Sequence, residues 1–115
     1  MGTVALCLPA LIPFTALAAS PAQRIGTVLD DWHRAASVAD EPRYLAHFAP
    51  NGIFMGTDAT ERWTVAAFRA WAKPYCDKKK AWSFRPRERH VDPLADGNTA
   101  WFDEMLDTPN LGRRS

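Results

Sequence analysis

The apolar residues that follow Ser20 recur at the spacing of an α-helix. They are Ile25, Val28, Leu29, Trp32 and Ala36. Residues at these intervals share one face of a helix with 3.6 residues per turn. Ser20 can cap the helix and Pro21 suits its first turn, so we predict a helix over residues 21–38.

A second, shorter helix is predicted to begin after Asp40. An Asp cap followed by Glu41 and Pro42 is typical of a helix start. The turn residues 50–52 are expected to end this helix. The apolar residues 53–55 then form a short strand, and the polar residues 56–62 form a loop.

Thr64 is the predicted cap of a third helix. Its apolar side comprises Val65, Phe68, Trp71, Ala72 and Tyr75. Pro74 has no amide hydrogen to donate to the helix ladder, so the helix is expected to fray near it. Residues 77–80 are charged and form a solvated connection.

From Trp82 onward the pattern changes to the alternation of β-strands. Strands are predicted over residues 82–91 and 99–106, joined by the turn signal of residues 96–98 into a long antiparallel hairpin. Pro86 requires an edge position or a bulge in the first of these strands. Residues 113–115 resemble the start of a further strand. Helices followed by antiparallel strands predict an α+β fold.

Residues 1–19 differ from the rest of the chain because they are apolar and carry no charge. Residues 16–18 fit the A-x-A pattern of a signal-peptide cleavage site, although no Lys or Arg lies near Met1. The segment is too short for a comfortable membrane span. We predict a signal peptide over 1–19, export to the periplasm or medium, a mature domain over 20–115 and no membrane contact. The alternative is an apolar N-terminal helix of a cytosolic protein.

Composition narrows the classes of partner. Of the 115 residues, 47% are hydrophobic and 23% are charged, and the net charge of +1 gives no reason to expect a nucleic-acid partner. Arg85, Arg87 and Arg89 share one face of a predicted strand, which we interpret as a solvated outer face, with phosphate binding as the alternative. Cysteine and histidine do not occur at metal-ligand spacing. We therefore predict no metal site.

Several segments together resemble the SnoaL-like branch of the nuclear transport factor 2-like superfamily. They are FMGTDATERW (54–63), KPY (73–75), RHV (89–91) and AWFDE (100–104). The resemblance covers residues 25–112, and the segment 54–63 is its most specific part.

This resemblance implies a cone-shaped, curved antiparallel sheet packed on three N-terminal helices around an apolar pocket. Similar proteins continue beyond residues 111–113 with two more strands, so the last strands of the cone are expected to be missing. Members of the superfamily include isomerase-, dehydratase- and cyclase-like enzymes and domains without catalysis. The chain is thus expected to bind an apolar small molecule, with or without cofactor-free acid–base catalysis. The alternatives are a non-catalytic ligand-binding or dimerisation domain, paired through the sheet, and an inactive fragment.

A carboxylate or histidine in an apolar pocket can act as a base near neutral pH, because burial shifts its pKa. The catalytic candidates are Asp58, Glu61, Asp103 and His90. Asp58 and Glu61 lie in the polar loop, where an Asx-turn or an ion pair is the structural alternative. Asp103 and Glu104 alternate along one strand and point to opposite faces, and the sequence leaves open which of them faces the concave side.

Large aromatic side chains suit the wall of an apolar cavity. The candidate pocket-lining residues are Trp32, Tyr44, Phe54, Thr57, Trp63, Phe68, Trp71, Trp101 and Glu104. Packing in the core is the alternative for each aromatic residue. His33 and His47 lie in predicted helical segments, where a histidine is more often a surface residue or a satisfied core residue.

Overall fold

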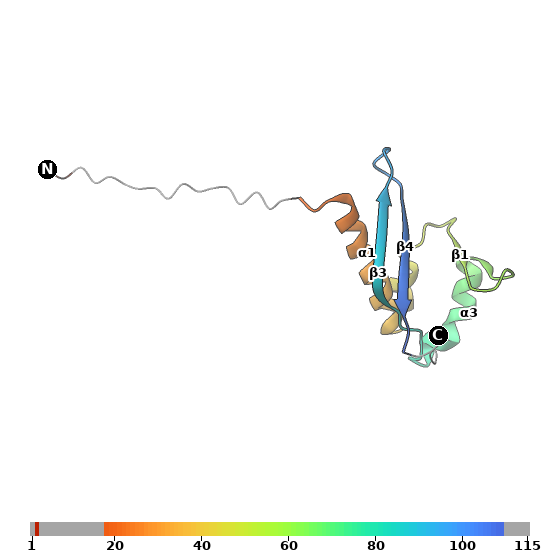
Figure 1. Cartoon of the computed structure of the whole chain (residues 1–115). Helices are drawn as coiled ribbons and strands as arrows, with labels where there is room; N and C mark the ends of the chain where they lie inside the picture. The colour runs from red at the N-terminus through yellow and green to blue at the C-terminus, as the bar shows by residue number, and fades with distance from the viewer. Residues whose placement is uncertain (1, 3–17, 110–115) are drawn as a thin grey trace.

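A computed structural model describes residues 2 and 18–109 (Figure 1). The elements, in chain order, are α1 (Pro21–Ser37), α2 (Glu41–Leu45), β1 (Ile53–Met55), β2 (Arg62–Thr64), α3 (Val65–Asp77), β3 (Arg85–Pro93) and β4 (Ala100–Asp107). The predicted α+β class is confirmed. Most of the predicted signal segment and the strand expected at 113–115 lie outside the described residues.

Helix α1 begins with a complete capping box. The Ser20 hydroxyl accepts a hydrogen bond from the Gln23 amide at 3.1 Å, and the Gln23 side chain accepts one from the Ser20 amide at 2.8 Å. These two contacts satisfy amide groups that have no partner within the helix. The helix ends at Ser37, one residue before the predicted end, and Ala39 follows with a positive φ of 56°.

The other two helices differ from their predictions in length. Helix α2 contains five residues, because the chain turns after Leu45 instead of continuing toward residue 50. Thr64 caps α3 as predicted, with its hydroxyl accepting from the Ala67 amide. The fraying expected near Pro74 is wrong, since α3 continues to Asp77. Pro74 lies in the last turn, where the loss of one backbone hydrogen bond is tolerated.

Residues 53–64 form a short hairpin. Strand β1 pairs antiparallel with β2, and Phe54 lies opposite Trp63. The segment 56–62, predicted as a loop, thus contains the turn and the first residue of a strand. The Gly56 amide donates to the Glu61 carbonyl at 2.9 Å, which closes the turn.

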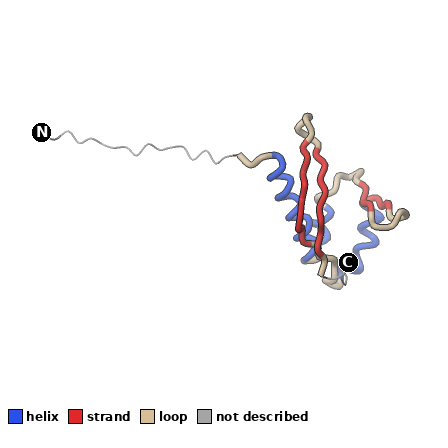
Figure 2. The backbone as a smooth tube through the Cα atoms, in the orientation of Figure 1, coloured by secondary structure: helices blue, strands red, loops and turns tan. Residues whose placement is uncertain are grey.

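Strands β3 and β4 form the long predicted hairpin, in which His90 lies opposite Asp103. The register shifts between Pro86 and Glu88, which confirms the expected bulge. Figure 2 shows this hairpin beside α1 and the β1–β2 hairpin beside α3. In the described part of the chain the strands form two separate two-stranded sheets and no closed barrel.

The core lies between α1, α2 and α3. Its buried residues are Ala35, Ala36, Tyr44, Leu45, Phe68 and Ala72. Phe68 is 2% exposed, and its ring centroid lies 4.3 Å from that of Phe54. Cys76 is also buried, and burial raises the pKa of its thiol. None of the helices among residues 18–109 is long and apolar enough to cross a membrane.

Candidate functional site

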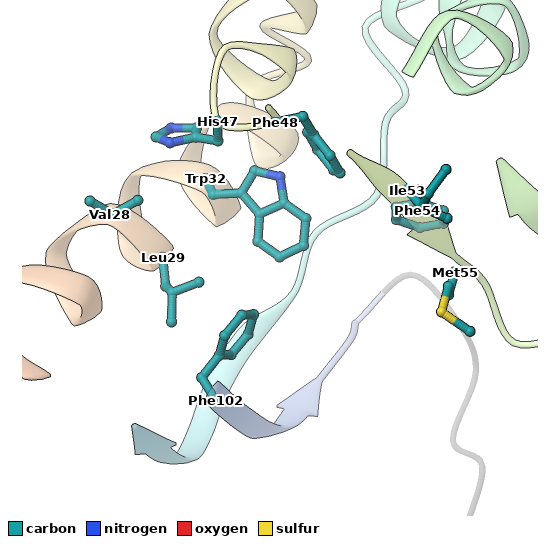
Figure 3. A pocket seen from close by; sticks show the side chains of 9 residues that line it. All are labelled: Val28, Leu29, Trp32, His47, Phe48, Ile53, Phe54, Met55 and Phe102. Carbon is teal, nitrogen blue, oxygen red and sulfur yellow. The ribbon is translucent and has the colours of Figure 1, made fainter. Parts of the chain in front are cut away.

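An apolar pocket of about 360 Å³ lies between α1, the segment after α2, and strands β1 and β4 (Figure 3). It is lined by Val28, Leu29, Trp32, His47, Phe48, Ile53, Phe54, Met55 and Phe102. Eight of these nine side chains are apolar, and His47 is the one titratable group among them. Ligand pockets commonly combine an apolar wall with few polar groups in this way.

The wall of the pocket exposes large apolar side chains to solvent. Met55 is 76% exposed, and Val28 and Phe102 are also exposed. Phe102 projects from the face of β4 that packs toward α1, while Trp32 connects the pocket to the core by stacking on Tyr44 at 5.2 Å. Exposed apolar residues gathered around one hollow are typical of a site that a ligand or partner covers.

A second hollow adjoins the pocket along α1. Both are lined by Val28, Leu29, His47 and Phe102. The second hollow continues to the turn of the long hairpin, where Gly97, Asn98 and Thr99 line it. The two hollows therefore form one trough along α1, and His47 lies where they meet.

His47 is held by a carboxylate from α1. Its Nε2 lies 2.7 Å from Oδ2 of Asp31. The other oxygen of Asp31 accepts hydrogen bonds from Arg43, with Nε at 3.0 Å. The Arg43 hydrogen bonds, followed by the His47 hydrogen bond, lower the pKa of Asp31 to about 2. Asp31 is therefore an anion throughout the physiological pH range.

A buried polar cluster fastens the long hairpin to α1. Glu104 of β4 accepts from Nε2 of His33 at 2.7 Å and from Nε of Arg89 at 3.3 Å. Arg89 also donates to the Gly26 carbonyl at 3.0 Å and pairs with Asp30 at 2.9 Å. Glu104 is thus the acid that faces the helices. It is predicted as a pocket-lining residue, but it lies in this cluster and not among the residues that line the apolar pocket.

The interpretation of Arg89 as part of a solvated outer face is wrong. Its side chain is largely buried against α1, whereas that of Arg87 is exposed. The bulge between Pro86 and Glu88 interrupts the alternation on which the prediction rested.

Asp58 and Glu61 lie in the turn between β1 and β2. Asp58 accepts from the amide and hydroxyl of Thr60 at 2.8 and 2.6 Å, and these hydrogen bonds lower its pKa. Glu61 accepts from the Thr57 amide at 3.0 Å. Neither carboxylate lines the apolar pocket, and both make contacts that stabilise the turn.

His90 and Asp103 lie opposite each other on the exposed face of the long hairpin. The Nε2 of His90 lies 2.9 Å from Glu88, and this hydrogen bond raises the pKa of His90. The structure therefore divides the four catalytic candidates between the turn of one hairpin and the outer face of the other. Their catalytic role stays a prediction.

The predicted pocket-lining residues occupy different places. Trp32 and Phe54 line the pocket. Tyr44 and Phe68 are buried in the core, and burial raises the pKa of the Tyr44 hydroxyl.

The remaining predicted pocket-lining residues lie elsewhere. Trp63 packs against the core, Trp71 packs beside Trp63 at 5.6 Å, Thr57 lies in the turn, and Trp101 is 70% exposed on the outer face of β4.

Sequence reasoning missed His47 as a pocket residue. Its neighbour Phe48 belongs to the apolar face of the predicted second helix, but a histidine beside an apolar residue does not by itself indicate a pocket. Its partner Asp31 lies sixteen residues earlier, so no local motif joins the two. Among the described residues, no group of histidine, cysteine and acidic side chains is placed to hold a metal ion.

Residues 25–114 match the family model described as SnoaL-like domain. The match covers more than half of the chain, so the chain belongs to this family of the nuclear transport factor 2-like superfamily. The resemblance found in the sequence is thereby confirmed. Comparison with curated proteins and with solved structures gave no match.

Proposed function

We propose that this domain binds an apolar small molecule in the pocket between α1, β1 and β4. The observation that carries the proposal is the composition of the wall, in which eight apolar side chains surround one histidine. The volume of about 360 Å³ lies within the range of ligand pockets. Membership of the SnoaL-like family supports a pocket protein of this kind.

The exposed wall indicates how binding is driven. Covering Val28, Met55 and Phe102 removes apolar surface from water, at about 25 cal/mol per Å². A ligand that buries about 300 Å² gains roughly 7.5 kcal/mol by this measure. The loss of translational and rotational freedom offsets several kcal/mol of that gain. Affinities between micromolar and millimolar are therefore expected for simple apolar probes.

Cofactor-free acid–base catalysis on the bound molecule, of an isomerase, dehydratase or cyclase type, is a second candidate. The observation that favours it is the position of His47 beside Asp31 in the pocket wall. A histidine held by a carboxylate is suited to accept and return a proton.

Self-association through the sheet is a further candidate. Trp101 and Met105 are exposed on the outer face of β4, on the side away from the pocket. Analytical ultracentrifugation of the Trp101→Ala variant tests it, with the expectation that the variant shifts toward the monomer.

Binding can be tested by titrating the protein with N-phenylnaphthylamine, a neutral probe whose fluorescence rises in apolar surroundings. Phe102→Ala is expected to weaken the binding, because it removes one wall of the pocket. Trp101→Ala is the matched control, since Trp101 is the neighbouring residue on the opposite face of the same strand. Equal loss in both variants, or no binding by the wild-type protein, would contradict the proposed pocket.

A further inference from the structure

We propose that His47, whose imidazole contacts the Asp31 carboxylate, is the hydrogen-bond acceptor that determines specificity in the pocket. The ligand it selects is an apolar molecule that carries a single hydrogen-bond donor, such as a hydroxyl group. This inference rests on the proposed binding of apolar molecules, and it adds a chemical class of ligand.

The contact with Asp31 fixes the tautomer of the His47 imidazole. Arg43 and His47 both donate to the Asp31 carboxylate, which stays ionised down to about pH 2. An anionic acceptor 2.7 Å from Nε2 keeps a proton on that nitrogen. In the neutral imidazole the second nitrogen, Nδ1, then carries a lone pair and accepts hydrogen bonds. Among residues 18–109, no side chain or backbone group donates to Nδ1.

The surroundings of His47 are otherwise apolar. Apart from Trp32, whose indole Nε1–H can only donate, His47 is the one residue of the pocket wall with a polar side chain, and it also lines the adjoining hollow. A ligand hydroxyl group that enters this wall gives up its hydrogen bonds to water. Leaving that group without a new partner costs about 1–3 kcal/mol. His47 is the group of the wall that can accept the hydrogen bond.

The charges beside His47 come from α1 and α2. Asp31 on α1 is an anion, and Arg43 on α2 is a cation that contacts the same carboxylate. Arg24 of α1 lines the adjoining hollow but is not among the residues that line the apolar pocket. The charges of Asp31 and Arg43 balance beside His47, so the pocket favours a neutral ligand over a charged one.

The test compares naphthol with its methyl ether, methoxynaphthalene. The two share an apolar ring system, and only naphthol can donate. Isothermal titration of the full chain should show naphthol binding roughly five- to tenfold more tightly, as expected for one hydrogen bond of about 1 kcal/mol. In His47→Leu the ratio of the two affinities should fall to about one.

Two further variants separate specificity from folding. Asp31→Asn should reduce the ratio, because the neutral amide no longer fixes the proton on Nε2. Asp92→Asn is the matched control, since Asp92 is exposed on β3 of the long hairpin, and the ratio should not change. Persistence of the ratio in both His47→Leu and Asp31→Asn would overturn the assignment.

The outcomes for the wild-type protein distinguish the two proposals. Equal affinities for naphthol and methoxynaphthalene would overturn the role of His47 and leave the apolar pocket standing. Failure of both compounds to bind would overturn the pocket and the role of His47 together.

Discussion

Nε2 of His33 lies 2.7 Å from Oε2 of Glu104, and this contact joins α1 to β4 in buried surroundings. The Glu104 side chain is 4% exposed, so water has little access to its oxygens. The second oxygen accepts from Arg89 at 3.3 Å. One carboxylate thus satisfies two donors from different elements, and it fixes how the long hairpin lies on the helix that carries the pocket wall.

Replacing Glu104 by alanine should lower the free energy of unfolding by roughly 3 kcal/mol, because it leaves buried donors on His33 and Arg89 without this acceptor. Chemical unfolding followed by tryptophan fluorescence measures the loss. Asp103→Ala is the matched control, since Asp103 is the exposed neighbour on the same strand, and it should change the free energy by no more than about 0.5 kcal/mol. A similar loss in both variants would contradict the structural role of Glu104.

The contact of Asp31 with Arg43 and His47 should make stability depend on acidity. The pKa of Asp31 is lowered from an ordinary value of 3.8 to about 2 in the folded chain. The stabilisation from this group is therefore present above the ordinary pKa and is lost as the pH falls from about 4 through about 2. Asp31→Asn should be less stable than the wild type near neutral pH.

The difference between Asp31→Asn and the wild type should shrink as the solution is acidified toward about pH 2. Urea unfolding at several pH values measures it. A stability difference that does not change with pH would show that the loss comes from packing around Asp31 and not from its ionisation.

The fold could be predicted where its causes are local. The capping box of Ser20 and Gln23 and the apolar stripe of α1 lie within a few turns of helix, and α1 ends within one residue of its predicted end. The strand β2 was missed because Arg62–Thr64 has only three residues, which is too short for its alternation to be recognised in the sequence. It forms a strand because the turn brings it against β1, so its structure depends on pairing with another segment of the chain.

The candidate site could be predicted only in part, because its wall comes from segments that are distant in the sequence. The alternation of β4 correctly predicted that Phe102 and Glu104 share one face of the strand. It did not predict which face of the strand packs on α1. Trp32 and Phe54 were identified from their aromatic character. The role of His47 depends on Asp31, and neither its position nor its charge partner can be read from the residues beside it.

The cap of α1 offers a test of local stability. Ser20→Ala removes the acceptor for the Gln23 amide and should lower the free energy of unfolding by about 1 kcal/mol. Ser37→Ala at the other end of the helix is the control, because its hydroxyl donates to a carbonyl of the last turn and caps no amide. Thermal unfolding by circular dichroism compares the two, and an equal loss would argue against the capping box as the cause.

His90 tests the electrostatics of the exposed face of the long hairpin. Its pKa is raised above the ordinary value of 6.5, first by the hydrogen bond to Glu88 and then by the negative charge of Asp103. A histidine with a raised pKa stabilises the fold below about pH 6.5. This contribution is lost as the pH rises through the pKa that the histidine has in the folded chain. An NMR titration should give a midpoint above 6.5 for His90, which His90→Gln identifies by removing the signal. Glu88→Gln should move the midpoint back toward 6.5, and an unchanged midpoint would rule out Glu88 as the main cause.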